Sequence, residues 1–338
     1  MTSTITEHTL TTDRHATFYL ACGDPGGVPI IFCHGWPELS VSWRHQLPAL
    51  AERGLYAIAP DMRGYGRSSQ YDAPSDHAVA ESEADMIELL DHLGAEKAIW
   101  VGHDWGTPIV WSMAQHHPDR CHGVAGLCVP YFPKGFILPE LVRQVDRALY
   151  PEEAFPVGQW DYWLFHRTQP DLCRQALEGH VRNTFYALFR AGEAAAMAQP
   201  SLTAMVQALG GWFGPDGAAA PELPLDTSVL TQAEATVYID AFERTGFGGA
   251  NMWYLNDALN SAHADAAPAP HLDMPVLFIH AAYDAICNTA TGTLADPMRA
   301  HCSALTEATV DSGHWIAQEK PAEVNAILTE WIDRALEV

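Results

Sequence analysis

At 338 residues the sequence is long enough for one large domain or two of moderate size, with ample material for a hydrophobic core. Its formal net charge of -24 repels nucleic acid and anionic membrane surfaces, so we expect neither as a partner. No apolar stretch reaches the roughly 20 residues of a membrane span. Residues 1–20 lack the basic-then-apolar layout of a secretory signal, so we predict a cytoplasmic location.

Cysteine and histidine patterns point away from disulfide and metal chemistry. The seven cysteines are scattered and include no C-x-x-C pair, and the seventeen histidines include no H-E-x-x-H or comparable ligand spacing. We therefore predict neither a disulfide framework nor a metal site. The chemistry inferred below requires no cofactor.

The first third of the sequence alternates short apolar runs with helical patterns. Runs rich in β-branched and aliphatic residues are typical of buried strands, and strict alternation of strand and helix predicts a mostly parallel sheet covered on both faces. The predicted fold class is therefore α/β. The expected strands are residues 28–33, 55–60, 98–102 and 123–129, and the expected helices are residues 42–53, 80–93 and 105–116.

This rhythm changes after residue 133, where an aromatic, helical block contains no strand-like run. A breaker-rich loop occupies residues 210–227. Strand-like runs resume at residues 274–284 and 304–311, and an amphipathic helix is expected over residues 321–336. We predict a helical cap inserted into an α/β core. The predicted domains are 1–132 for the first part of the core, 133–252 for the cap and 253–338 for the second part of the core.

Residues able to carry chemistry follow four of the expected strands. In open α/β sheets, reactive groups gather in the loops at the carboxyl ends of the strands, where backbone amides and helix N-termini converge. One such loop lies within VGHDWGTPIVW (101–111), where an aspartate stands in a turn between two glycines. The four loops contain His34-Gly35-Trp36-Pro37, Gly102-His103-Asp104-Trp105-Gly106, Asp284, and Ser312-Gly313-His314-Trp315.

Asp104, Asp284 and His314 follow the order of nucleophile, acid and histidine in the α/β-hydrolase triad, where a strained turn between strand and helix exposes the nucleophile. The sequence contains no G-x-S-x-G, so Asp104 takes the nucleophile position. A carboxylate is ionised at neutral pH and attacks a polarised saturated carbon without a general base. We expect the resulting ester of Asp104 to be hydrolysed by water that His314 activates and Asp284 orients through His314.

Hydrolysis of that ester develops an oxyanion, which requires two backbone N–H donors. In this fold they come from the residue after the nucleophile and from the loop after an earlier strand, so we predict the N–H groups of Trp105 and Trp36. Each feature is weak alone, because a lone G-x-D-x-G is more often a plain turn. Their order and their common position at strand ends make the combination specific.

Five segments match motifs of one enzyme family. Residues 34–69 match its H-G-x-P loop and the following D-x-R-G-x-G-x-S segment, GHDWG (102–106) matches its nucleophile elbow, and residues 311–328 match its histidine segment. WDYWLFHRTQP (160–170) and residues 237–256 match the stretches that carry its two lid tyrosines. Over nearly its whole length the sequence therefore resembles the α/β-hydrolase-fold epoxide hydrolases.

The resemblance implies that Tyr162 and Tyr238 are the lid tyrosines, which hold and protonate the epoxide oxygen. It implies a hydrolase acting on ether bonds that converts a small apolar epoxide and water into a vicinal diol without a cofactor. Trp163 stands where a glutamine is common in the family, and we interpret Trp163 and Trp315 as part of an aromatic substrate pocket. Residues 249–256 are a loose version of the usual G-x-L-N-W-Y-R, which leaves the substrate range open. A homodimer is compatible with the sequence.

Two other functions are compatible with the same residues. A haloalkane or haloacid dehalogenase would use the same triad, but a leaving halide requires N–H donors, whereas an epoxide oxygen requires an acid. The tyrosine pair therefore favours the epoxide hydrolase. A non-catalytic ligand-binding protein of this fold is the third interpretation, and the complete triad disfavours it. Halide release without diol formation, or epoxide binding without turnover, would reverse this ranking.

Overall fold

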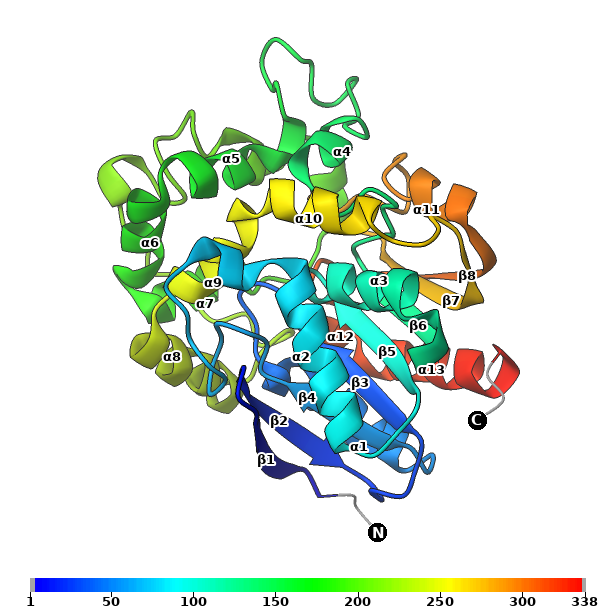
Figure 1. Ribbon diagram of the computed structural model, residues 1–338. Helices are drawn as coiled ribbons and strands as arrows, with labels where there is room; N and C mark the ends of the chain where they lie inside the picture. The colour runs from blue at the N-terminus through cyan, green and yellow to red at the C-terminus, as the bar shows by residue number, and fades with distance from the viewer. Residues whose placement is uncertain (1–3, 336–338) are drawn as a thin grey trace.

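The computed structural model describes residues 4–335 and contains an eight-stranded sheet in the order β1-β2-β4-β3-β5-β6-β7-β8 (Figure 1). β2 is antiparallel to both of its neighbours, β1 and β4, and all other neighbouring strands are parallel. The strands are β1 (Thr6–Thr11), β2 (Ala16–Cys22), β3 (Pro29–Cys33), β4 (Tyr56–Pro60), β5 (Ala98–His103), β6 (Cys121–Leu127), β7 (Leu272–Ala281) and β8 (Cys302–Val310).

The middle of the sheet is the hydrophobic centre of the molecule. Every residue of β3, β4 and β5 is buried, as expected for parallel strands that helices cover on both faces. Their sequences, PIIFC, YAIAP and AIWVGH, are almost continuously apolar for the same reason. The six strands expected from the sequence are all present within a few residues, and the α/β prediction is confirmed.

The N-terminal hairpin of β1 and β2 is not predicted from the sequence. β1 reads TEHTLT and lies at the edge of the sheet with five of its six residues exposed, so it lacks the apolar run that marks a buried strand. β2 pairs antiparallel with β1 and no helix separates them, so the pair also departs from the alternation of strand and helix on which the prediction depends.

Connections between the strands place helices on both faces of the sheet. The chain runs from β3 to β4 in one direction across the sheet and then returns past β3 to β5 and β6. Right-handed crossovers therefore put α1 (Gln46–Ala51) on one face and both α2 (Val79–His92) and α3 (Gly106–His116) on the other. The direction reverses between the neighbours β3 and β5, and ligands of open α/β sheets bind at such a switch point. C-terminal helix α13 (Pro321–Ala335) packs against α1.

A long helical segment separates β6 from β7, and Figure 1 shows its green and yellow helices beyond one end of the sheet. It lies where the sequence predicts a cap. Its helices are α4 (Leu138–Val142), α5 (Asp161–Thr168), α6 (Pro170–Glu178), α7 (Val181–Leu188), α8 (Gln232–Thr245), α9 (Gly248–Met252) and α10 (Asp257–Asp265), with short 3-10 turns such as η8 (Trp253–Leu255) between them. Two further helices, α11 (Asp296–His301) and α12 (Ile316–Glu319), flank β8.

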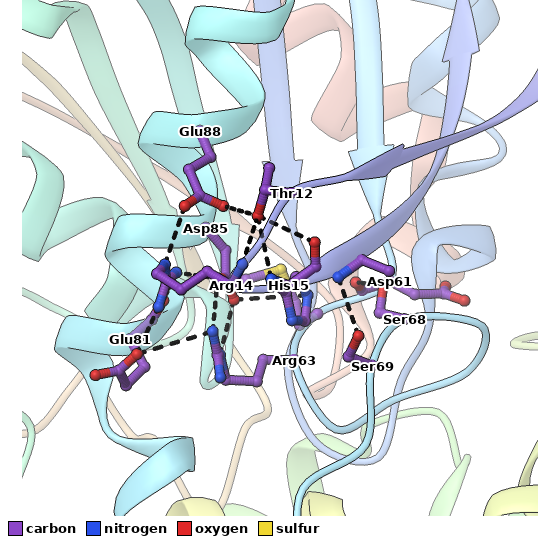
Figure 2. Close-up of polar contacts among 12 residues, drawn as sticks. Thr12, Arg14, His15, Asp61, Arg63, Ser68, Ser69, Glu81, Asp85 and Glu88 are labelled. Atoms are coloured by element: carbon purple, nitrogen blue, oxygen red, sulfur yellow. Dashed lines mark hydrogen bonds and ion pairs between the residues drawn. The ribbon is translucent and has the colours of Figure 1, made fainter.

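A charged cluster fastens the N-terminal hairpin to α2 (Figure 2). Asp85 of α2 accepts two hydrogen bonds from Arg63, with N to O distances of 2.7 and 2.8 Å, and Arg14 donates to the same carboxylate. Arg14 also binds Glu81 and Glu88 of α2. The side chains of Arg63 and Asp85 are only 3% and 2% exposed, so this pair is one of the few in the described chain that bulk water does not screen.

Within residues 4–335, none of the helices combines the length and the apolar character that a membrane span requires.

Candidate active site

Asp104 occupies the turn between β5 and α3 with a backbone φ of +49°. This left-handed conformation is unfavourable for a residue with a Cβ atom and is retained where the surrounding structure enforces it. Two glycines make the turn feasible. A Cβ atom on Gly106 would lie 2.1 Å from the carbonyl oxygen of Cys33 in β3, and one on Gly102 would lie 2.6 Å from the Cα of Thr107.

The two carboxylate oxygens of Asp104 have different partners. Oδ1 accepts a hydrogen bond of 2.6 Å from the backbone N–H of Trp36, in the loop that follows β3. Oδ2 lies 3.5 Å from Nε2 of His314. The loop after β3 can approach so closely because Gly35 has no side chain, and a Cβ atom there would lie 2.3 Å from Oδ1. Trp105, the other predicted oxyanion donor, follows Asp104 directly at the start of α3.

His314 bridges Asp104 and Asp284. Its Nδ1 lies 2.7 Å from Oδ2 of Asp284, whose other oxygen accepts backbone hydrogen bonds from Ile286 and Cys287 at 3.0 and 2.9 Å. Burial alone lowers the pKa of His314, but the carboxylates of Asp284 and Asp104 outweigh burial and raise it well above its ordinary value. Burial alone raises the pKa of Asp284, but His314 and the two N–H groups bring it below its ordinary value. The three residues predicted as a triad therefore meet, and the two carboxylates favour the protonated form of His314.

A cavity of about 360 Å³ opens over this triad, which is within the size range of small-molecule sites. Asp104, Asp284 and His314 line one side of it. Tryptophan and tyrosine side chains line much of the remainder, so the cavity suits a largely apolar ligand with one polar centre. The aromatic lining comes from Trp36, Tyr162, Trp212, Tyr254, Tyr283 and Trp315.

Two tyrosines of the lining lie close together. Tyr162 is on α5 and Tyr254 is in η8, and their ring centroids are 5.7 Å apart at an interplanar angle of 80°. Burial raises the pKa of both phenols well above the ordinary value, and the nearby Asp104 carboxylate acts in the same direction. Both phenols are therefore protonated at neutral pH and able to donate a hydrogen bond.

Tyr238, predicted as the second lid tyrosine, does not line the cavity. It is fully buried on α8, its hydroxyl is 2.8 Å from Ser42 Oγ and donates to Gln318 at 3.1 Å, and its ring packs on Phe185 and Phe189. Tyr254 lines the cavity instead. The signal was present in the sequence, because Tyr254 is the tyrosine within residues 249–256, the stretch that resembles G-x-L-N-W-Y-R.

The two predicted pocket tryptophans have different positions. Trp315 lines the cavity and stacks on Phe189, with ring centroids 4.0 Å apart. Trp163 does not line it, because its ring is fully buried among Trp105, Phe136 and Tyr254. Its indole N–H donates to the carbonyl oxygen of Tyr254 at 3.1 Å, so Trp163 holds the backbone of a residue that lines the cavity.

A buried pair behind the triad was not predicted as functional. His103 Nδ1 lies 2.7 Å from Oε2 of Glu38, and its Nε2 lies 2.7 Å from the backbone carbonyl oxygen of His314. Glu38 also accepts the N–H of Gly35 at 2.9 Å. Although burial alone raises the pKa of Glu38, His103 lowers it to about 2. The pair joins the loop after β3, the turn of Asp104 and the loop of His314.

The chain is similar in sequence and fold to known proteins. Residues 28–321 match the family model of the alpha/beta hydrolase fold. The chain is 33% identical over 335 residues to epoxide hydrolase A of Mycobacterium tuberculosis, a match that covers 97% of each chain. It is 35% identical over 333 residues to epoxide hydrolase B of the same species, covering 91% of this chain and 92% of that one.

A solved structure shows the same architecture. The crystal structure of epoxide hydrolase A from Mycobacterium thermoresistibile superimposes with a TM-score of 0.79 at 34% identity, covering 99% of this chain and 100% of that one. Fold and sequence thus agree with known epoxide hydrolases along nearly the entire length. The chain belongs to the epoxide hydrolases of the α/β-hydrolase fold.

Proposed function

We propose that this protein opens an epoxide to a vicinal diol through a covalent ester of Asp104, without a cofactor. The observation that carries the proposal is the unequal environment of the Asp104 carboxylate. Oδ1 is held by the N–H of Trp36, and Oδ2 faces the cavity-lining His314. One oxygen is thus placed in a site for the developing oxyanion, and the other remains available for attack.

In the first step, Oδ2 attacks an epoxide carbon and forms a carbon to oxygen bond while the ring bond to the epoxide oxygen breaks. The electron pair of that bond stays on the epoxide oxygen, which takes a proton from Tyr162 or Tyr254. General acid assistance of this kind contributes typically 10²- to 10⁴-fold. Both phenols line the same cavity as Asp104 and hold their protons at neutral pH.

In the second step, His314 removes a proton from water, which attacks the Asp104 carbonyl carbon. Ester formation removes one of the two negative charges that keep His314 protonated, so the pKa of His314 falls when the ester forms. The proton that His314 then releases restores the phenol that protonated the epoxide oxygen, and the neutral imidazole becomes a base. The oxyanion forms on Oδ1 at the N–H of Trp36, with the N–H of Trp105 as second donor. The bond to Oδ2 then breaks, and the diol leaves with that oxygen and the proton from His314.

The cavity favours an epoxide over a haloalkane. A leaving halide needs N–H donors, yet the indole N–H groups of the lining tryptophans are already used. Trp36 donates to Asn251 Oδ1 at 3.1 Å, and Trp212 donates to His166 Nε2 at 3.2 Å. Trp315 donates to the carbonyl oxygen of Leu188 at 2.8 Å. The two phenols remain as donors, and they supply the proton that an alkoxide requires.

We assign residues 133–252 to a cap that completes the cavity, since Tyr162 lies within it. A small apolar epoxide and water are the expected substrates, and a cytoplasmic location and a homodimer stay predictions.

The decisive test is trapping of the ester. His314→Gln removes the base of the second step and leaves the nucleophile, so the intact protein should gain the mass of one substrate molecule on incubation with an aryl or alkyl epoxide, while diol formation stops. Asp104→Asn is the matched control, because asparagine tolerates the positive φ and should show neither adduct nor diol. Absence of an adduct in folded His314→Gln protein would favour direct attack of water, and an adduct in Asp104→Asn would place the nucleophile elsewhere.

A further inference from the structure

Three helices meet around a cluster of histidines that the proposed reaction does not use. Glu83 lies on α2, His116 and His117 end α3, and His263 lies on α10 (Figure 1). α10 follows the predicted cap and leads into β7, whereas α2 and α3 cover the sheet. The cluster therefore joins the end of the inserted helices to the core.

The carboxylate of Glu83 is the centre of the cluster. Oε2 accepts a hydrogen bond from Ser112 of α3 and lies 3.0 Å from Nε2 of His263. Oε1 lies 3.0 Å from Nε2 of His117. Glu83 is only 5% exposed, so a buried carboxylate contacts two imidazole rings here.

His116 is the member of the cluster with an unpaired ring nitrogen. Its ring stacks on that of His263 with centroids 4.0 Å apart and an interplanar angle of 7°. Its Nε2 is buried and has no hydrogen-bond partner among residues 4–335. Leaving a buried polar atom unpaired costs about 1–3 kcal/mol, so an unpaired imidazole nitrogen in a cluster with a buried carboxylate calls for an explanation.

We propose that Glu83, His116 and His263 bind a structural Zn²⁺ ion. The ligand atoms of these three residues lie within 4.8 Å of one another. Zinc binding requires side-chain rotations that unstack the rings of His116 and His263 and bring the ligand atoms to about 2.0–2.2 Å from the ion. Two imidazoles and one carboxylate suit zinc and related transition metals better than Mg²⁺ or Ca²⁺, which prefer oxygen ligands. His117 is placed to supply the fourth ligand or to hold Glu83 in position.

The position of the cluster favours a structural ion over a catalytic one. α3 begins beside Asp104 and ends at His116, so at 1.5 Å per residue the cluster lies about 18 Å from the nucleophile. The adjoining cavity, which Ser112 and His263 help to line, has a volume of only about 20 Å³, close to that of a single water molecule. An ion there would hold α2, α3 and α10 together. The ligands come from three separate helices, so they produce no short spacing motif in the sequence.

Zinc binding is tested on protein stripped with a chelator, by calorimetry with Zn²⁺ and by the visible spectrum of added Co²⁺. His314 also brings ligand atoms within 4.8 Å of His103 and Cys128, and of Asp284 and Cys287, so the titrations are repeated in His314→Gln protein, which lacks both of those groups. We expect one Zn²⁺ per chain in that background, a tetrahedral Co²⁺ spectrum, and a higher thermal midpoint with Zn²⁺ but not with Mg²⁺.

Variants then locate the ion. His116→Ala and His263→Ala should each weaken Zn²⁺ binding by at least about 100-fold and abolish the rise in midpoint. His92→Ala, at an exposed position of the same helix as Glu83, is the matched control and should bind as the parent does. Glu83→Gln is isosteric and serves if an alanine variant does not fold. No Zn²⁺ binding in the His314→Gln background, or binding that survives His116→Ala and Glu83→Gln unchanged, overturns the proposal.

Discussion

Two regions of the molecule place a histidine beside a buried aspartate, and only one of them is suited to chemistry. In the candidate active site, His314 Nδ1 lies 2.7 Å from Asp284. In the charged cluster of Figure 2, His15 Nε2 lies 3.6 Å from Asp85. Both aspartates are almost completely buried, and in each pair a ring nitrogen of the histidine lies within 4.0 Å of a carboxylate oxygen.

The charges around each pair differ. Asp85 is bound by Arg63 and Arg14, so its negative charge is already compensated. Burial, together with these two arginines, lowers the pKa of His15 to about 3. The carboxylates of Asp284 and Asp104 instead raise the pKa of His314, whose other nitrogen faces a carboxylate at the wall of a cavity. A buried His–Asp contact is therefore informative about catalysis only when no cation neutralises the aspartate and a cavity gives access to the histidine.

Replacing each aspartate with asparagine should give the largest and most opposed effects. In Asp284→Asn the amide N–H donates to Nδ1 of His314, so the imidazole carries its proton on Nε2. Nε2 then cannot accept a proton from water, and diol formation should fall on the order of 10⁴-fold in a folded protein. Asp85→Asn leaves Arg63 buried without its counter-charge and should cost about 3–5 kcal/mol in unfolding free energy with little change in kcat. Steady-state kinetics and denaturant unfolding of both variants measure the two effects.

The outcome that breaks this comparison is an exchange of the two phenotypes. If Asp85→Asn lost turnover at unchanged stability, the charged cluster would act on the triad. If Asp284→Asn lost stability and kept turnover, His314 would not need its orienting carboxylate.

Tyr254 lines the cavity, whereas Tyr238 is packed away from it, so the two tyrosines should respond differently to substitution. Tyr254→Phe removes a donor that faces the cavity, so the rate of ester formation should fall about 10²-fold. Tyr238→Phe removes a hydroxyl that lies between Ser42 and Gln318, and should cost about 1–3 kcal/mol in stability while ester formation stays near that of the parent. Rapid-quench mass spectrometry of the ester, with unfolding curves alongside, checks both. An equal loss of ester formation in the two variants would restore Tyr238 as a lid tyrosine.

The proximity of Asp104, Asp284 and His314 could be predicted because the strands that position them are strongly patterned. β5 is a buried aliphatic run that ends in a glycine-flanked turn, and the loops after β7 and β8 carry Asp284 and His314. The carboxyl ends of parallel strands meet at one edge of the sheet, so the order of residues along the chain was enough to bring these side chains together.

The side chains of the helical segment between β6 and β7 could not be predicted to the same degree, because the direction of a side chain on a helix depends on tertiary packing. Tyr238 and Tyr254 lie in one matched stretch, yet α8 turns Tyr238 toward Ser42 and Gln318 while η8 turns Tyr254 toward Asp104. Trp163 is one residue from the cavity-lining Tyr162 and points into the packing behind it. A one-residue step on a helix rotates the side chain by about 100°, which sequence resemblance alone does not resolve.

The smallest expected effect concerns the pH dependence of stability through His15. In the unfolded chain this histidine binds a proton near its ordinary pKa of 6.5, whereas in the folded protein its pKa is about 3. Between these values the unfolded state binds more protons, so stability falls as the pH falls. Going from pH 7 to pH 5, this one group should cost about 2 kcal/mol in unfolding free energy.

His15→Gln, which keeps a polar group near the Tyr71 hydroxyl, should lose less stability over that interval than the parent. His8→Gln, at an exposed position of β1, is the control and should show the parent's change of unfolding free energy with pH. If His15→Gln also showed the parent's change, burial and the arginines of the charged cluster would not keep His15 neutral.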